Sequence, residues 1–279
     1  MKNTTTSPWF ARFPRLMGAF LQRDYLTQLS YRTAFALSFF GLFFRAFVFF
    51  FISRFIGDAA DEGLAAYNAD YFAFVLIGLA LNPYFDVGLT AFARALRQAQ
   101  TTGTLEAMMM TPTPVSYLVI GSAVWSYAFT TFQVFVYLLL GALLGVNFAN
   151  ANWVAAVVGL LLAIVAFASI GIMAASIIMV IKRGDPVTAV IANVSALVGG
   201  VYYPLETLPN WLQAVAQFVP LTHALRVLRL SLLNGATVSQ LRNELLILLL
   251  FCLLLLPLAL FSFRYAVDKA RQDGSLAQY

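Results

Sequence analysis

The chain has 279 residues, of which 61% are hydrophobic and 10% are charged, and its mean hydropathy is +0.83. Average soluble domains are about a quarter charged, so this composition excludes a soluble globular protein and indicates an integral membrane protein. The formal net charge of +5 is no sign of nucleic-acid binding, because the basic residues are scattered at the ends of apolar runs, as membrane topology requires.

The N-terminal segment, residues 1–32, is expected to form an amphipathic helix in the headgroup plane on the cytosolic side. Apolar residues recur at helical spacing from Pro14 onward, and Pro14 suits a first helical turn. A plain juxtamembrane linker is the alternative. The first long apolar run begins only near Thr33 and exceeds the roughly 7–15 residues of a signal-peptide core, so we expect no cleaved signal. The expected interfacial anchors are Trp9, Phe10 and Phe13.

Six apolar runs follow, each near or above the ~20 residues that a helix needs to cross a bilayer. They predict an all-α domain of six transmembrane helices over residues 33–266, followed by a cytosolic tail, residues 267–279. The expected spans are residues 33–56, 71–93, 115–146, 153–181, 186–203 and 245–266.

Basic residues set the expected orientation. With six spans, most of them fall on one side, whereas the other side carries four acidic residues before the second span and the near-neutral turn 147–152. The positive-inside rule then makes both termini cytoplasmic, in a plasma membrane that we expect to be a bacterial cytoplasmic membrane. The outer segment 203–244 is an exception that carries Arg226, Arg229 and Arg242, but the rule is weaker for long, structured segments.

Residues 98–114, QAQTTGTLEAMMMTPTP, separate the second and third spans. Their polar side chains would lose water in lipid without replacement, so the segment is expected to lie on the cytosolic side as a short helix. Its three adjacent methionines would make an adaptable docking surface for another protein. An ordinary cytosolic loop is the alternative.

A second polar stretch, residues 204–243, predicts a re-entrant helical hairpin on the outer side, which we call the outer hairpin. Thr207 and Pro209 resemble a helix start, Pro220 ends that helix, and Thr222 is expected to cap a second one. Neither helix is long enough to span. Irregular backbone at membrane depth is tolerated against protein or a wet cavity, so we expect the hairpin beside a translocation path. A purely structural lid is the alternative.

Two ionisable residues fall inside expected spans. Arg45 lies about 12 residues, or ~18 Å, from the inner start of the first span. Asp86 lies about 8 residues, or ~12 Å, from the inner end of the second span. Charges at such depth usually pair or face water, so we expect an Arg45–Asp86 pair. The alternative is that Arg45 faces a cavity and attracts an anionic group of the substrate.

No catalytic or metal site is expected. The three lysines lie outside any G-x-x-x-x-G-K-[ST] pattern, so the chain has no P-loop to hold a nucleotide phosphate. The single histidine, His223, has no neighbouring cysteine for metal binding, and a lone histidine on an amphipathic helix is more often a packing residue.

Two stretches, GTLEAMMMTPTP (103–114) and YYPLETLPNWLQAVAQFVPLTHALRVLR (202–229), resemble permease subunits of type-2 ATP-binding-cassette exporters, and the resemblance covers essentially the whole chain. It implies that segment 98–114 docks into a groove of a separate ATPase subunit. The family's glutamate matches Glu106, and the N-terminal helix also touches the ATPase. It further implies two permease copies, expected to be a homodimer, and two ATPase copies that hold ATP and Mg²⁺. His223 departs from many relatives, which carry an aromatic residue there.

The expected site residues fall into three sets, of which Arg45 and Asp86, as an intramembrane charge pair or part of a substrate path, are the first. The residues expected to couple to the ATPase are Gly103, Thr104, Leu105, Glu106, Met108, Met109, Met110 and Pro112. The residues expected at the outer gate are Gly199, Gly200, Tyr202, Tyr203, Pro204, Pro209, Trp211, Pro220 and His223.

The expected function is ATP-driven export of a hydrophobic or amphipathic substrate, drug-like or lipid-like, because the spans are poor in hydrogen-bonding side chains. Export of a lipid-linked glycan or polysaccharide by the same machinery is an alternative. A non-transporting membrane scaffold is an alternative of another class. An ion-coupled secondary transporter should carry several carboxylates at mid-membrane depth, whereas only Asp86 is found there.

Overall fold

The computed structural model describes residues 9–30, 32–57, 64, 67, 69–101, 115–181 and 185–272. In these ranges every regular element is a helix, which confirms the expected all-helical class. The elements are α1 (Trp9–Ser30), α2 (Arg32–Ile56), α3 (Tyr71–Thr101), α5 (Val115–Leu143), α6 (Trp153–Ile181), α7 (Asp185–Val198), η2 (Leu205–Thr207), α8 (Asn210–Ala216), α9 (Pro220–Leu233) and α10 (Arg242–Gln272).

Five helices, α2, α3, α5, α6 and α10, are long and apolar enough to cross a membrane, which confirms a multi-pass membrane protein. The helix at the expected fifth span, α7, has 14 residues. At 1.5 Å per residue it extends roughly 21 Å, less than the ~30 Å of a hydrocarbon core. The expectation of a helix up to Tyr203 is wrong, because residues 199–203 form a turn in which Gly200 has φ = +76°. The six-span arrangement therefore stays a prediction.

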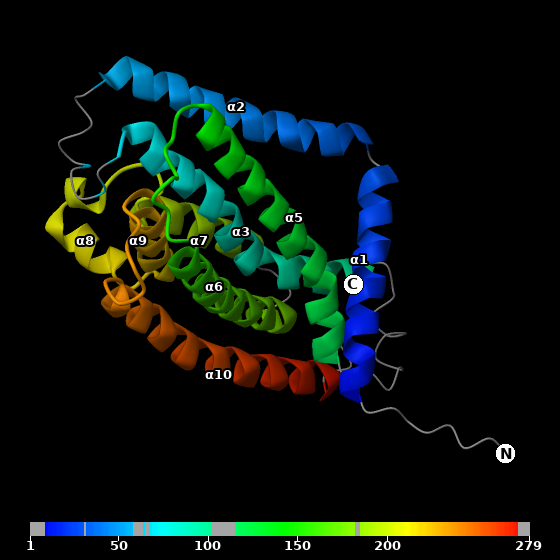
Figure 1. Cartoon of the computed structure of the whole chain (residues 1–279). Coiled ribbons are helices and arrows are strands. Elements are labelled where there is room, and N and C mark those ends of the chain that lie inside the picture. The colour runs from blue at the N-terminus through cyan, green and yellow to red at the C-terminus, as the bar shows by residue number, and fades with distance from the viewer. Residues whose placement is uncertain are drawn as a thin grey trace.

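The third helix, α3, is the centre of the molecule. It packs against α5, α6 and α9. In the most apolar stretch of α3, 83% of the residues are buried. The corresponding share is 11% in α2, which runs along the edge of the molecule (Figure 1). Close packing against α6 requires glycine: a Cβ on Gly171 would lie 1.7 Å from the Gly88 carbonyl oxygen. Glycine at such a crossing lets two backbones approach where apolar burial gives little driving force in lipid.

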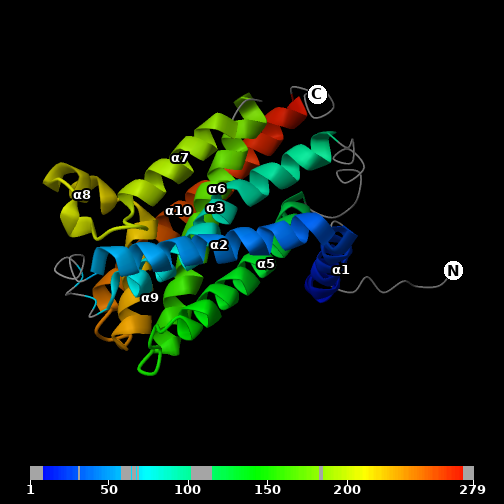
Figure 2. The same ribbon diagram turned by 90° about the horizontal axis from the view of Figure 1, so that it is seen from above.

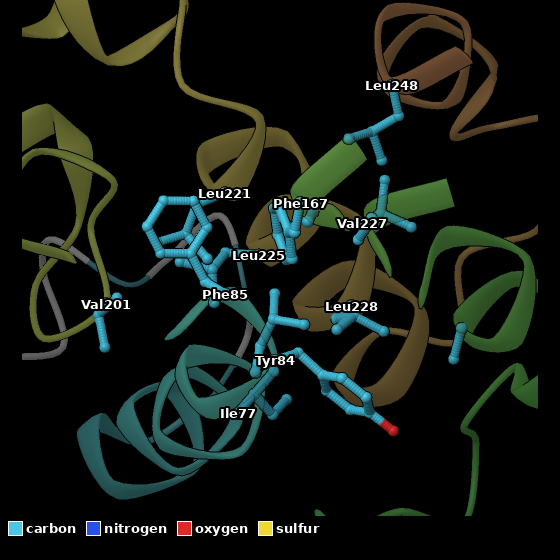
Figure 3. Close-up of a cluster of buried hydrophobic side chains, with 14 of the residues drawn as sticks. Ile77, Tyr84, Phe85, Phe167, Val201, Leu221, Leu225, Val227, Leu228 and Leu248 are labelled. Atoms are coloured by element: carbon cyan, nitrogen blue, oxygen red, sulfur yellow. The ribbon is translucent and has the colours of Figure 1, made fainter. Parts of the chain in front are cut away.

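The main core joins α3, α6, α9 and α10. Figure 3 shows Ile77 and Phe85 of α3, Phe167 of α6 and Leu225 of α9 directed into one buried cluster. The α9 helix is therefore part of the core and is buried along most of its length. Its neighbour α8 lies at the surface, with Trp211 69% exposed.

The first helix, α1, packs crosswise against the beginning of α5, at the end of the molecule opposite α8 (Figure 2). A Cβ on Gly121 would lie 2.6 Å from the Phe20 ring, and Tyr25 makes an edge-on contact with Trp125. The helix begins at Trp9 and continues through Pro14, so the expectation that Pro14 marks its first turn is wrong. Its place in the headgroup plane stays a prediction.

Candidate functional site

The expected ATPase-coupling residues lie outside the described residues, because the structure describes nothing between Thr101 and Val115. Along the chain, this segment stands between two described helices. It joins the end of α3 to the beginning of α5, and α1 packs beside that beginning. The end of α3, the beginning of α5 and the helix that we expect to assist the coupling segment thus lie at the same end of the molecule.

Three other connections gather at the opposite end. The amide of Asn152, after the α5–α6 turn, donates to the Ser231 carbonyl at 2.8 Å, which joins that turn to the end of α9. The Tyr71 hydroxyl, at the start of α3, donates to the Tyr202 carbonyl at 3.1 Å. The Tyr202 ring stacks on Phe49 of α2 at 5.6 Å. These contacts place at one end the segments that sequence analysis assigned to one side of the membrane.

Residues 204–243 contain the helices α8 and α9, whose caps differ from the expected ones. Pro209 is the N-cap residue of α8 and not a residue of its first turn, and the Thr207 hydroxyl donates to the Pro204 carbonyl. The N-cap of α9 is Val219, so the expected cap by Thr222 is wrong. Pro220 opens α9 instead and supplies no N–H, which suits a first turn. Thr222 lies inside that turn, and its hydroxyl is buried with no hydrogen-bond partner in the structure.

Arg229 holds the turn before the hairpin. Its side chain is 3% exposed and donates to three backbone carbonyls: Nε to Phe74 at 3.2 Å, Nη1 to Gly200 at 2.9 Å and Nη2 to Val201 at 3.0 Å. Its Cζ also lies 3.3 Å from the centre of the Phe74 ring, a cation–π geometry. Burial lowers the pKa of Arg229 from its ordinary value, but a guanidinium remains a cation at neutral pH.

In the sequence, Arg229 stands out only as an exception to the charge rule, and this role was not predicted. The available signal in the sequence was an arginine among the apolar residues of an amphipathic helix. In the structure, nearly every neighbour of Arg229 along α9 is buried. The partners themselves were not readable, because Phe74 is separated from Arg229 by 155 positions.

His223 lies in a second polar cluster that fastens α9 to α10. Its Nδ1 is 2.5 Å from Glu244 Oε2, and its Nε2 is 2.9 Å from the Gln217 carbonyl oxygen. Arg226 donates to the other carboxylate oxygen of Glu244 at 2.8 Å. Burial by itself lowers the pKa of Arg226, but its hydrogen bond and charge interaction with Glu244 leave that pKa above its ordinary value. The role of His223 had no specific prediction, and Glu244 was not among the expected site residues.

The intramembrane charges Arg45 and Asp86 lie near each other without direct contact. The charge of Arg45 acts on both Asp86 and Tyr137, yet among ion pairs between described residues none joins Arg45 to Asp86. Asp86 instead accepts a hydrogen bond from Asn82 at 3.1 Å, and Arg45 is exposed at the surface of α2. The expected direct Arg45–Asp86 pair is thus not formed in this structure, and a role of Arg45 in a substrate path stays a prediction.

Comparison with known families decides which kind of membrane protein this is. Residues 15–233 match the family model described as ABC-2 type transporter. The chain belongs to the ABC-2 type transporter family. The predicted resemblance to a type-2 ABC permease subunit is thereby confirmed, and an ABC-2 permease works with a separate ATPase subunit. A search of curated proteins gave no match.

Proposed function

We propose that this ABC-2 permease exports a hydrophobic or amphipathic small molecule from the cytoplasm or the inner leaflet, driven by ATP hydrolysis on the separate subunit. The observation that carries the proposal is the family match over residues 15–233. The architecture supports it, because α3 connects segment 102–114 at one end to the turn and hairpin contacts at the other.

In this mechanism, ATP binding brings the ATPase subunits together and moves segment 98–114 and α1. The helices α3 and α5 carry that movement through the membrane, and the outer hairpin opens or closes the exit. The system has two states, and ATP shifts the population by binding one of them more tightly. The complex would contain two permease copies, as a homodimer, and two ATPase copies that hold ATP and Mg²⁺.

The six-span topology is part of this proposal. The helix α6 begins directly after Asn152 and has 29 residues, so its last residue lies far from Asn152. Ser231 of α9, which comes later in the chain, nevertheless accepts a hydrogen bond from the Asn152 amide. The intervening chain must therefore return to the end from which α6 started, and α7 is the helix that would bring it back. With this return, both termini are cytoplasmic in the plasma membrane, and the outer hairpin lies outside.

The exposed surfaces support the proposed chemical class of the substrate. The exposed side chains of α2 and α10 are mostly apolar, as a lipid-facing or apolar-substrate path requires. A lipid-linked glycan is the second candidate, because exposed Arg45 on α2 could receive its anionic linkage. A membrane scaffold without transport is the rival of another class.

Glu106→Arg tests the proposal in the intact complex. We expect this change to leave the permease folded and bound in the membrane but to uncouple ATP hydrolysis from transport, because a positive charge would replace the docking carboxylate. The measurement is the rate of ATP hydrolysis by the complex in lipid nanodiscs, with and without substrate. Unchanged stimulation would count against the docking role, and a purified permease that never binds an ATPase subunit would favour the scaffold.

A further inference from the structure

One side chain, Arg229, fastens three separate parts of the permease. It extends from α9, donates from Nε to the Phe74 carbonyl of α3 at 3.2 Å, and donates from its two terminal nitrogens to the carbonyls of Gly200 and Val201 at 2.9 and 3.0 Å. Because the donors of a guanidinium are fixed in one plane, the relative positions of the three carbonyls are fixed as well.

The two turn carbonyls need this donor. The helix α7 ends at Val198, and carbonyls beyond a helix end lack an intrahelical N–H partner. Val201 is 0% exposed, so its carbonyl cannot turn to solvent without moving the turn. Arg229 is thus the group that lets this turn remain buried against α3.

The turn also touches α3 directly. A Cβ on Gly78 would lie 2.3 Å from the Val201 oxygen and 3.1 Å from Arg229 Nη2, so only glycine allows this approach. A second tie runs from the Tyr71 hydroxyl to the Tyr202 carbonyl at 3.1 Å. The turn therefore has two independent hydrogen-bonded ties to the first residues of α3.

The opposite end of α3 is Thr101, directly before the segment proposed to meet the ATPase. With 31 residues, α3 is roughly 46 Å long at 1.5 Å per residue. The hairpin has another tie, from Arg226 to Glu244 of α10 at 2.8 Å. If α3 moves relative to α10, the hairpin can keep its contacts with only one of these two helices, and its contacts with the other must change.

We infer that Arg229 is a positioning residue that makes the outer hairpin follow α3 and not α10 when ATP moves the permease. The inference rests on the proposed function and adds the residue through which the movement reaches the hairpin. Arg229→Lys keeps the charge but supplies a single ammonium, which cannot reach the three carbonyls in the same geometry.

The test measures movement in the complete complex with its ATPase subunit, in nanodiscs, with and without Mg-ATP and orthovanadate. A Cys252→Ala background removes the single cysteine of the chain. One pair of spin labels, at Asp70→Cys and Leu253→Cys, reports α3 against α10. A second pair, at Gln217→Cys and Leu253→Cys, reports the hairpin against α10. All three positions are exposed, and labelled chain is diluted with unlabelled chain so that distances arise within one copy.

In the parent complex we expect both distances to shift with nucleotide. In Arg229→Lys the α3 distance should still shift, whereas the hairpin shift should be lost. Tyr71→Phe removes only the second tie, so most of the hairpin shift should remain, because the three Arg229 hydrogen bonds are unchanged. The matched control is Arg226→Lys, one turn earlier on α9, which touches α10 and should retain the parental hairpin shift.

A hairpin shift of parental size in Arg229→Lys would overturn the inference and leave the proposed function intact. If Arg229→Lys cannot be purified, loss of the hairpin shift in Arg226→Lys would overturn the inference, because the hairpin would then depend on its tie to α10. A parent complex in which neither pair responds to nucleotide would overturn the proposed function and the inference together. A structural role alone would reduce both distance shifts equally, so the separation of the two readouts is the decisive result.

Discussion

The polar side chains of α9 are stabilised in two different ways. Arg229 is fully enclosed and is surrounded by carbonyl dipoles and the Phe74 ring. Arg226 and His223 share the two oxygens of one carboxylate, Glu244. A buried charge without such partners would cost several kcal/mol, so each arrangement makes it possible for α9 to lie in the core.

The first prediction concerns Glu244→Gln, which keeps the size of the side chain but removes its charge. Since hydrogen bonds to charged groups contribute about 1.5–3 kcal/mol, we expect the free energy of unfolding to fall by about that amount. Thermal unfolding of the purified permease in detergent measures the loss. Arg242→Gln, at an exposed position in the first turn of α10, is the control and should change stability by less than about 0.5 kcal/mol. Equal losses in both variants would contradict the role of Glu244.

A second prediction at this scale separates the two roles of Arg45. If its charge stabilises Asp86, then Arg45→Asp and Asp86→Arg should each lower expression of folded protein, and the double exchange should restore it. If Arg45 instead receives an anionic substrate group, Arg45→Gln should leave folding intact and abolish substrate stimulation of ATP turnover. Expression monitored by size-exclusion chromatography, together with ATP turnover, distinguishes these outcomes.

At the scale of elements, close helix crossings are set by glycine. Gly88 and Gly171 let α3 and α6 touch through their backbones, and a Cβ at either position would collide with the other helix. By contrast, Gly41 of α2 has nothing within 4 Å of an added Cβ. Gly171 and Gly41 both lie in apolar helices, but only Gly171 is required for close helix packing, and this difference is visible only in the packed structure.

The third prediction uses this contrast. Gly171→Ala should destabilise the permease by about 1–3 kcal/mol, because the backbone of α3 or α6 must move to admit the methyl group. Gly41→Ala, on the edge helix, should be neutral or stabilising by up to about 1 kcal/mol through higher helix propensity. The midpoints of thermal unfolding in the same detergent provide the comparison. Similar midpoints for the two variants would be evidence against a tight α3–α6 crossing.

At the scale of the whole molecule, topology depends on whether α7 returns the chain to the outer end. The Asn152–Ser231 hydrogen bond joins segments on either side of α6 and α7. With an odd number of crossings between them, the two segments would be separated by the membrane. Their contact therefore supports two crossings, of which α7 supplies the second.

The fourth prediction tests this topology by labelling single cysteines in a Cys252→Ala background in whole cells. We expect Asn150→Cys and Gln240→Cys to react with a membrane-impermeant maleimide, because both exposed positions lie at the outer end. Gln272→Cys, exposed at the end of α10, should react only after lysis. Reaction of Gln272→Cys in intact cells would show that the chain makes five crossings and not six.

Hydropathy alone predicted the helical class and four helix starts closely: α3, α5 and α6 begin at the expected residues, and α2 begins at Arg32 beside the expected Thr33. It could do so because a long apolar run has no stable backbone arrangement in lipid other than a helix. The expectation failed where Gly200 and Val219 decide local geometry, since a turn and an N-cap depend on single backbone torsions.

By itself, then, the sequence determined that this is a membrane protein of several helices, and its motifs determined its family. Both properties are local, because they depend on which residues follow one another along the chain. Only the tertiary structure decided that α3 is central, that Glu244 binds His223 and Arg226, and that Arg229 binds Phe74 across 155 positions. The physical reason is that the sequence of an apolar helix does not determine which of its side chains contact another helix. The role of a buried arginine depends on the carbonyl groups that lie within hydrogen-bond distance of it after the helices have packed.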